Sequence, residues 1–313
     1  MSNINIQRAV ENIRSTTTVF TPVVEAVVNA IQAIEQAGRS DGLVQLKVRR
    51  PSQKEIEPAD EESSRILDVL VTDNGIGFTR FNRDSFDTLY SAQKIQIGGK
   101  GFGRLTWLRY FEGVHIDSRY RDGDRVCRRE FDMGTDKELI VHERVTELEG
   151  DDDTQTTVTL LGERTDKLPR KLTTIARGLV ELLLPYFTTQ GYSCPRIELS
   201  ELDGSRVIAL NDYVDSPGAI IRELTLPRAT FSLPSSHGER EFRVRVFKFL
   251  SPQNKASKVS LVAHKREVTE TSLTGYIPEF SEEFVEDPGG DRSGRRNYIL
   301  KAYVFGPYLD QHV

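Results

Sequence analysis

Two side chains that could do chemistry, Glu25 and Asn29, stand in the segment TPVVEAVVNAIQAIEQAG, which has the pattern of an amphipathic helix. Thr21 is suited to cap this helix and Gly38 to end it. Because residues four apart share one face of a helix, the carboxylate and the carboxamide are expected side by side among apolar neighbours. A carboxylate on the buried side of a helix needs a partner, which makes this pair a candidate site.

A second candidate is Asp73, which opens the stretch DNGIGF. The preceding ILDVLVT is an apolar run typical of an interior strand, so an acidic side chain is expected where a central strand ends. Gly75 and Gly77 permit positive φ in the turn that follows, and Phe78 closes the motif.

The third candidate is a glycine-rich stretch that runs into the helical pattern GRLTWLRYF. Its members are Gly98, Gly99, Lys100, Gly101, Phe102 and Gly103. Such a stretch exposes backbone N–H groups to phosphate oxygens, and the start of the following helix adds its positive dipole end. Lys94 is a second nearby cation, for which a plain solvated lysine is the preferred interpretation. Arg104 could reach a phosphate or pair with a carboxylate, and the sequence favours neither.

Each of the three motifs has an ordinary structural explanation when taken alone. A carboxylate and a carboxamide four apart occur on many solvated helices, DNGIG is often a turn, and clustered glycines are commonly linkers. The three occur in one order, on a predicted helix, a predicted strand end and a predicted helix start. This shared context favours a single site over three coincidences.

In order, spacing and local context the three segments resemble the GHKL ATPases, the superfamily of gyrase, the ninety-kilodalton heat-shock chaperones, histidine kinases and MutL. The resemblance rests on ExxxNA at Glu25–Ala30, DNGIGF at Asp73–Phe78 and GGKGFG at Gly98–Gly103. The strand QTTVTL at Gln155–Leu160 is similar to the family's GTxVxL strand, with Gln155 where glycine is usual.

The resemblance implies an ATP site that uses Mg²⁺, with a role for each matching residue. Glu25 would be the general base that polarises the attacking water, and Asn29 would hold Mg²⁺ through its side-chain oxygen. Asp73 would accept the adenine amino group, and Thr156 would support the same edge of the base through its hydroxyl or a water.

The glycines are also given roles by the resemblance. Gly77 would let the base approach the backbone, and Gly99–Gly103 would wrap the phosphates as part of a mobile lid, with Lys100 close to the γ-phosphate. A lysine from the second domain touches the γ-phosphate in this family. Lys255 and Lys258 are weak candidates for it here.

Composition indicates a folded cytoplasmic protein of more than one core. The 313 residues exceed what a single core usually needs, and no apolar run approaches membrane-spanning length. The amino-terminal stretch lacks the hydrophobic centre of a signal peptide. Cys127 and Cys194 stand in unlike contexts, which favours neither a disulfide framework nor a structural metal. The net charge of −5 argues against a surface dominated by nonspecific nucleic-acid binding.

The predicted organisation is α+β in two domains, 1–212 and 213–313, with a boundary near Asp215–Gly218. The resemblance implies that the first domain is a Bergerat-type α/β sandwich, an antiparallel-rich mixed sheet with helices on one face. The strand-rich second part resembles the family's βαβ transducer domain. Since that domain normally continues beyond such strands, the chain is expected to be a piece of a longer protein.

The leading functional hypothesis is a slow ATPase that acts as a conformational switch, on the chaperone, MutL and MORC side of the superfamily. ATP would order the lid, promote homodimerisation and signal to a C-terminal effector or partner protein. An alternative is an ATP-gated DNA clamp in repair, chromatin-like compaction or phage defence. It would use a basic stripe formed by Arg243, Arg245, Lys248, Arg295 and Arg296. A third is a nucleotide-binding scaffold without hydrolysis, against which Glu25 argues.

Overall fold

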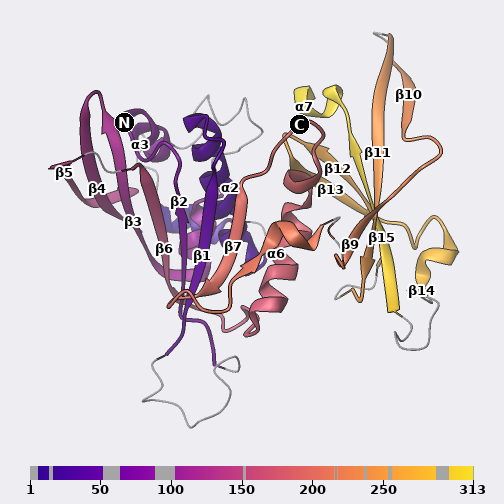
Figure 1. Cartoon of the computed structure of the whole chain (residues 1–313), viewed down its shortest axis with the longest axis horizontal. Coiled ribbons are helices and arrows are strands. Elements are labelled where there is room, and N and C mark those ends of the chain that lie inside the picture. Colours follow the sequence, from indigo (N-terminus) through magenta and orange to yellow (C-terminus); the bar gives the residue numbers. More distant parts are fainter. Residues whose placement is uncertain are drawn as a thin grey trace. The chain divides into compact units, whose positions relative to one another are not determined.

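The computed structural model is a mixed α+β structure whose described part contains two mixed sheets and six α-helices (Figure 1). The residues described are 6–13, 17–51, 64–88, 103–150, 153–214, 216, 218–235, 238–252, 256–286 and 296–312. The chain divides into two compact units, Met1–Glu181 with Ser193–Leu210, and Leu182–Tyr192 with Asn211–Val313. The second unit thus includes a segment that the sequence-based boundary at residue 212 assigns to the first domain.

The sheet of the first unit has the strand order β5-β4-β3-β6-β2-β1-β7-β8. Strands β1 and β7 pair in parallel, and the other neighbours pair antiparallel, which agrees with the antiparallel-rich mixed sheet that the resemblance implies. The strands are β1 Leu43–Arg49, β2 Asp68–Asp73, β3 Phe111–Asp122, β4 Arg125–Met133, β5 Ile140–Leu148, β6 Gln155–Glu163, β7 Arg196–Glu201 and β8 Ile208–Ala209.

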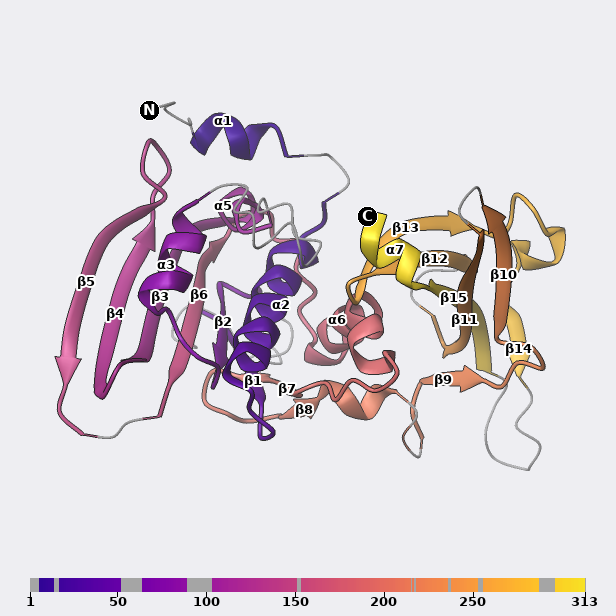
Figure 2. The same ribbon diagram turned by 90° about the horizontal axis from the view of Figure 1, so that it is seen from above.

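Helices α2, α3 and α5 lie over one face of this sheet (Figure 2). The helices that begin in the first unit are α1 Ile6–Glu11, α2 Phe20–Ala37, α3 Arg80–Asp87, α5 Leu105–Tyr110 and α6 Leu172–Thr188. The strand residues that face the helices are buried and mostly alternate with less buried residues on the other face.

Helix α2 begins earlier than its sequence signals predict. Its first residue is Phe20 rather than Pro22, and no side chain caps it. The Thr21 hydroxyl lies inside the first turn, where it accepts a hydrogen bond from the Thr18 N–H at 2.9 Å. The predicted end is confirmed, because Gly38 adopts the left-handed conformation at φ 64°.

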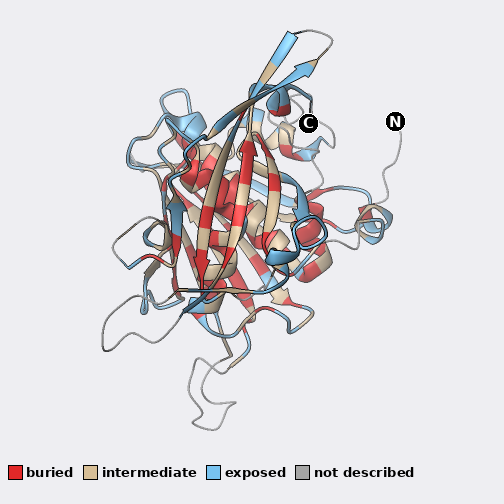
Figure 3. Ribbon diagram, turned by 90° about the vertical axis from the view of Figure 1, so that its right-hand side faces the viewer, coloured by how far each residue is buried: buried red, intermediate tan, exposed pale blue. Residues whose placement is uncertain are grey.

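The second unit is built on a sheet of order β10-β11-β15-β12-β13, with β9 pairing with β11 and β14 with β15. Buried and partly buried residues alternate in the middle of β15 and near the end of β11, whereas the first residues of both strands are mostly exposed (Figure 3). Its elements are η3 Leu210–Tyr213, which straddles the boundary between the units, β9 Ile221–Leu224, β10 Thr230–Ser235, β11 Gly238–Leu250, β12 Lys258–Ala263, β13 Arg266–Ser272, η4 Pro278–Ser281, β14 Phe284–Glu286, β15 Arg296–Phe305 and α7 Pro307–His312.

The described part of the connection between the parallel strands β12 and β15 differs from the βαβ arrangement that the resemblance implies. In the described part of this connection, the elements are β13, the 3₁₀-helix η4 and β14, and none is an α-helix. The stretch contains short β-branched and polar runs broken by Gly275 and Pro278, which favour strands and turns over a helix.

The turn after β2 touches the backbone of α2. The Ile76 N–H donates to the Ala33 carbonyl at 3.1 Å, and a Cβ at Gly75 would lie 2.5 Å from the Ala33 carbonyl carbon. Gly75 is not among the residues with positive φ, whereas Gly77 is, at 80°. Position 75 therefore needs glycine for close approach to the helix, and only position 77 needs it for its backbone conformation.

Gly75→Ala is expected to destabilise the first unit by about 2 kcal/mol or more, because the backbone of α2 would have to move away from the turn. The single tryptophan of the chain, Trp107, is buried in this unit, so its fluorescence follows the unfolding in urea. Gly113→Ala on β3 is the matched control, since its added Cβ would meet only ordinary contacts at 3.8 Å. Equal urea midpoints for the two variants would contradict the contact.

Candidate functional site

Asp73 is a buried carboxylate at the end of β2, with 5% of its surface exposed. Its Oδ1 accepts a hydrogen bond from the Gly75 N–H at 2.8 Å. Within the described residues this amide is the one donor to the carboxylate. Asp73 therefore keeps acceptor capacity on the helix-covered face of the sheet.

Burial also changes the acidity of this group. Removal from water raises the pKa of the Asp73 carboxyl from 3.8 to about 7, and the hydrogen bond from the Gly75 N–H opposes that shift only in part. A donor that lies beside the carboxylate in a ligand would favour the ionised form and return the pKa toward its ordinary value.

Asp73 belongs to a row of polar residues that crosses three strands on the inner face of the sheet. Asp73 on β2 is the direct partner of Thr156 on β6, which is the direct partner of Ser118 on β3. All three are buried, at 5%, 3% and 0% exposed. The next row on the same face is wholly apolar and consists of Val71, Val158 and Ile116. The polar row is therefore a local feature of one end of the sheet.

Ser118 links this row to the turn after β2 and was not singled out from the sequence. Its Oγ accepts the Phe78 N–H at 2.9 Å and lies 2.9 Å from Thr156 Oγ1. A sequence signal did exist, because Ser118 continues the alternation of Val114 and Ile116 and so stands where an apolar residue is expected.

The turn Gly77–Phe78 is fixed from several sides. A Cβ at Gly77 would lie 2.6 Å from the Arg119 carbonyl oxygen, so the turn is pressed against β3. The Asn82 side-chain amide donates to the Gly77 carbonyl at 2.9 Å. The ring of Phe78, a predicted nucleotide contact, packs edge-on against Phe86 with the ring centroids 5.4 Å apart. Phe78 therefore offers its backbone, rather than its ring, to this end of the sheet.

Glu25 and Asn29 are both half-buried on α2, one turn apart. The Glu25 carboxylate lies directly against Gly103, since a Cβ at that position would overlap its carboxyl atoms. The structure thus brings the predicted base together with the last glycine of the glycine-rich stretch. Only glycine leaves room for this approach.

Helix α2 connects the two halves of the candidate site. Its residue Ala33 contacts the turn after Asp73, and its residue Glu25 contacts Gly103. Eight residues of α-helix span about 12 Å. The contacts of α2 with the turn after Asp73 and with Gly103 are therefore about 12 Å apart along the helix axis.

Within the described residues Arg104 contacts backbone carbonyls and an aromatic ring rather than a carboxylate, and its contact with a phosphate stays a prediction. Its guanidinium is 2% exposed and donates to the Thr88 carbonyl at 2.9 Å, with a longer contact of 3.5 Å to the Ser85 carbonyl. It also lies over the Phe86 ring at 5.0 Å. Burial lowers the pKa of Arg104 to about 10, so the side chain stays cationic at neutral pH. In this arrangement it joins the end of α3 to the start of α5.

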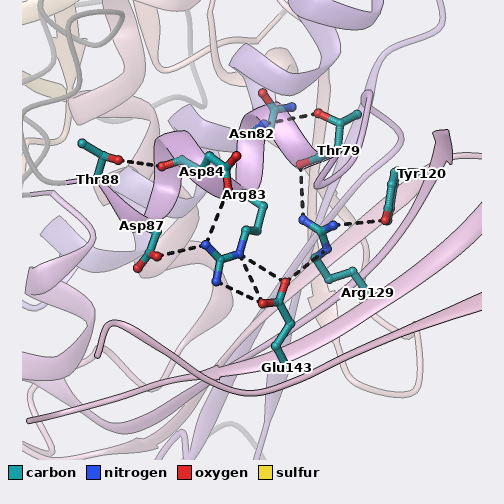
Figure 4. Close-up of polar contacts among 9 residues, drawn as sticks. All are labelled: Thr79, Asn82, Arg83, Asp84, Asp87, Thr88, Tyr120, Arg129 and Glu143. Carbon is teal, nitrogen blue, oxygen red and sulfur yellow. Dashed lines mark hydrogen bonds and ion pairs between the residues drawn. The ribbon is translucent and has the colours of Figure 1, made fainter. Parts of the chain in front are cut away.

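A polar network holds α3 against strands β3 to β5 (Figure 4). The Arg83 guanidinium contacts the Glu143 carboxylate at 3.0 to 3.2 Å and Asp87 at 2.9 Å. Arg129 reaches the same Glu143 at 3.4 Å and donates to the Tyr120 hydroxyl at 3.1 Å. The network fixes the helix that directly follows the Gly77 turn.

Several predicted site residues lie outside the described residues, namely Lys94, Gly98, Gly99, Lys100, Gly101 and Phe102. The predicted sensor lysine Lys255 also lies outside them, and Lys258 forms an ion pair with Glu270. Among the residues described, no three His, Cys, Asp or Glu side chains are placed to hold a metal ion together. No helix in this part of the chain is long and apolar enough to cross a membrane.

The described residues of the basic stripe predicted on the second unit do not lie on one face of its sheet. Arg243 and Arg245 project from one face of β11 and Lys248 from the other, because successive strand residues alternate. Arg245 is paired with Glu223, and Lys248 with Glu286 at 2.8 Å. Arg296 is exposed, and Arg295 lies outside the described residues. Pairing with carboxylates leaves little excess charge along β11 for a polyanion.

Comparison with known proteins shows a likeness to solved structures but no match among family models or curated proteins. A solved structure, "Crystal Structure of N terminal domain of a DNA repair protein", is similar to it at 13% sequence identity and a TM-score of 0.48. The match covers 84% of this chain and 78% of that chain. At this identity and TM-score, neither family nor function follows from the likeness.

Asp73 is expected to make the stability of the ligand-free protein depend on pH. The pKa of the Asp73 carboxyl is about 7 in the folded protein, against an ordinary value of 3.8. Its protonation therefore stabilises the folded form fully below pH 4, and this stabilisation is lost as the pH rises through 7. Relative to Asp73→Asn, the unfolding free energy should fall by roughly 1.4 kcal/mol per pH unit between these values. Trp107 fluorescence in urea measures it. Parallel pH profiles for the two proteins would exclude the shifted pKa.

Proposed function

We propose that the first unit binds ATP with Mg²⁺ and hydrolyses it slowly, as a Bergerat-type domain of the GHKL superfamily. One observation carries the proposal. A buried carboxylate with spare acceptor capacity, Asp73, lies about two turns of α2 away from the point where Glu25 meets the glycine-rich stretch. A ligand with an amino group at one end and a chain of phosphates at the other would match this arrangement. Its amino group would meet Asp73, and its phosphates would meet the glycine-rich stretch beside Glu25.

The base end would be read by the polar row. Asp73 accepts the 6-amino group of adenine, and the Thr156 hydroxyl lies beside it on the neighbouring strand. The ring of the base would lie against the Gly77 turn, which β3 supports from the other side. Burial makes each hydrogen bond at this end more selective, because an unmatched polar group would stay unsatisfied.

The phosphate end would be served by α2 and by the glycine-rich stretch. Glu25 accepts a proton from the water that attacks the γ-phosphorus. Asn29 would supply one oxygen to Mg²⁺, which fits an ion that keeps most of its waters and takes the rest of its ligands from phosphates. When bound, the ion would neutralise charge on the β- and γ-phosphates. Gly98–Gly103 and Lys100 would contact the same phosphates.

The biological output we propose is a conformational switch in the cytoplasm. ATP binding would promote association with a second copy of the chain and pass the nucleotide state to an effector region or partner protein. Chemistry that rests on one general base and on the closing of a lid would be slow, and a slow cycle suits a switch better than a metabolic enzyme. We keep DNA as a lesser candidate partner, since the paired charges on β11 do not favour it.

Asp73→Ala is expected to lower ATP affinity at least a hundredfold, because the adenine amino donor loses its charged acceptor. Isothermal titration calorimetry with Mg·ATP measures the effect. Asp117→Ala is the matched control, because Asp117 lies on the opposite face of β3 and should leave affinity within a few fold. Unchanged affinity in Asp73→Ala would remove the adenine end of the site.

Glu25→Gln is expected to keep ATP binding and lower phosphate release by roughly two orders of magnitude or more, as removal of a general base requires. The shape of the side chain is conserved, so its contact with Gly103 is retained. Glu35→Gln, on the exposed part of the same helix, is the control for altered helix charge. Turnover that survives in Glu25→Gln would assign the base elsewhere, and wild-type binding without any phosphate release would favour a scaffold.

A further inference from the structure

The outer face of the first sheet, which is turned away from α2, α3 and α5, contains a hollow of about 310 Å³ over strands β3, β4 and β6. Its lining consists of half-buried polar side chains, namely Asp117, Arg119, Arg128, Gln155 and Thr157. These residues alternate with the buried Ser118 and Thr156, so the hollow and the polar row lie on opposite faces. A volume of this size is at the small end of the range for small-molecule sites. Because every lining side chain is polar, hydrogen bonds and charge would select the ligand.

Arg128 is held by carboxylates along one edge of its guanidinium. Its Nε and Nη2 donate to the two oxygens of Asp117 at 2.9 and 2.8 Å, and Nη2 also lies 3.0 Å from Glu130. The hydrogen bonds to Asp117 raise the pKa of Arg128 above its usual value, so the side chain stays cationic. Within the described part of the chain, no protein group accepts from Nη1. The guanidinium therefore keeps N–H donors for a ligand in the hollow.

Gln155 stands where the resembled strand usually has glycine, and its side chain reaches across to β3. Its Oε1 accepts a hydrogen bond from Arg119 Nη2 at 2.7 Å. Because a guanidinium can only donate, the oxygen of the amide must face Arg119 and the nitrogen must face away from it. Among the described residues the amide nitrogen has no acceptor. Gln155 therefore brings two further N–H donors to the hollow, which a glycine would not supply.

The charges around the hollow favour an anion. Arg119 and Arg128 are direct partners across β3 and β4, and like charges that lie opposite each other on neighbouring strands repel. An anion between the two guanidinium groups would remove this repulsion. The lining has two arginines and one aspartate, which leaves one positive charge in excess. A carboxylate balances this excess and accepts several hydrogen bonds, whereas a phosphate group carries closer to two negative charges.

We propose that this hollow binds the carboxylate of a small organic acid, which lies between Arg119 and Arg128 and accepts a hydrogen bond from the Gln155 amide. Both guanidinium groups are oriented in advance, Arg128 by Asp117 and Arg119 by Gln155, so little side-chain freedom is lost on binding. The Thr157 hydroxyl, which is bonded to Thr72 at 2.9 Å, keeps capacity for a polar substituent of the same ligand. The site is separate from the proposed nucleotide site, which lies on the inner face of the sheet.

Ligand-observed NMR titrations with lactate, its neutral amide lactamide and inorganic phosphate test the proposal. The wild-type protein should bind lactate about tenfold more tightly than either of the others, because only lactate matches the excess charge. Gln155→Glu keeps an oxygen for Arg119 but replaces the amide donor with a negative oxygen, and should lower lactate affinity at least tenfold. Gln45→Glu makes the same change on the same face, two strands away from β6, and should leave affinity within twofold.

The remaining outcomes decide against the proposal. Lactate affinity that is equal in the wild type and in Gln155→Glu, or that falls equally in Gln45→Glu, would exclude a site at Gln155. Tighter binding of phosphate than of lactate would overturn the choice of a carboxylate. Displacement of lactate by saturating Mg·ADP would place it in the nucleotide site instead. If Gln155→Glu does not fold, Gln155→Met, which removes the amide donor without adding charge, must lower lactate affinity at least threefold.

Discussion

The contact between the backbone of α2 and the turn after β2 is the constraint on which the candidate site depends. Gly75 lies so close to Ala33 that no side chain fits between them, and the Ile76 amide is bonded to the helix at the same point. This contact fixes the position of α2, along the helix axis, relative to Asp73. The place where Glu25 meets Gly103 then follows from helix geometry. Two motifs far apart in the sequence are thereby held at a set distance.

The polar row that faces this helix is a second departure from an ordinary sheet. Its apolar neighbours Val71, Val158 and Ile116 show what the strand pattern would otherwise supply. Burying a carboxylate, a threonine and a serine in their place costs stability unless each is satisfied, and burial raises the pKa of Asp73 for the same reason. Polar groups that are costly to bury are expected where a ligand supplies their missing hydrogen bonds. The adjacent apolar row contains no such groups.

Much of the local structure was predictable, because it depends on patterns within short windows. The strand that ends at Asp73 and the helix that ends at Gly38 have unambiguous signals, and the structure confirms them. The start of α2 was predicted too late, since Thr21 and Pro22 are typical of a helix start but packing extends the helix to Phe20.

The rest depends on contacts between distant segments. Ser118 stands out as a polar residue in an apolar phase, yet its partnership with Thr156 follows only from the register of β3 against β6. The reason for Gly75 is likewise the approach of α2, which no local rule contains. In the second unit, composition predicts a stripe of basic residues. The sheet places these residues on alternating faces and beside glutamates, which separates and neutralises their charges.

Arg104 links the two described segments that flank the glycine-rich stretch. Thr88 and Arg104 stand on either side of residues 89–103, and the hydrogen bond between them fixes the two flanks to each other. A planar guanidinium suits this task, because its separate N–H groups reach two carbonyls at the end of α3 while its face covers Phe86. A lysine would offer a single point of attachment. Gly103 directly precedes Arg104. The hydrogen bond between Arg104 and Thr88 and the position of α2 therefore together set the contact between Gly103 and Glu25.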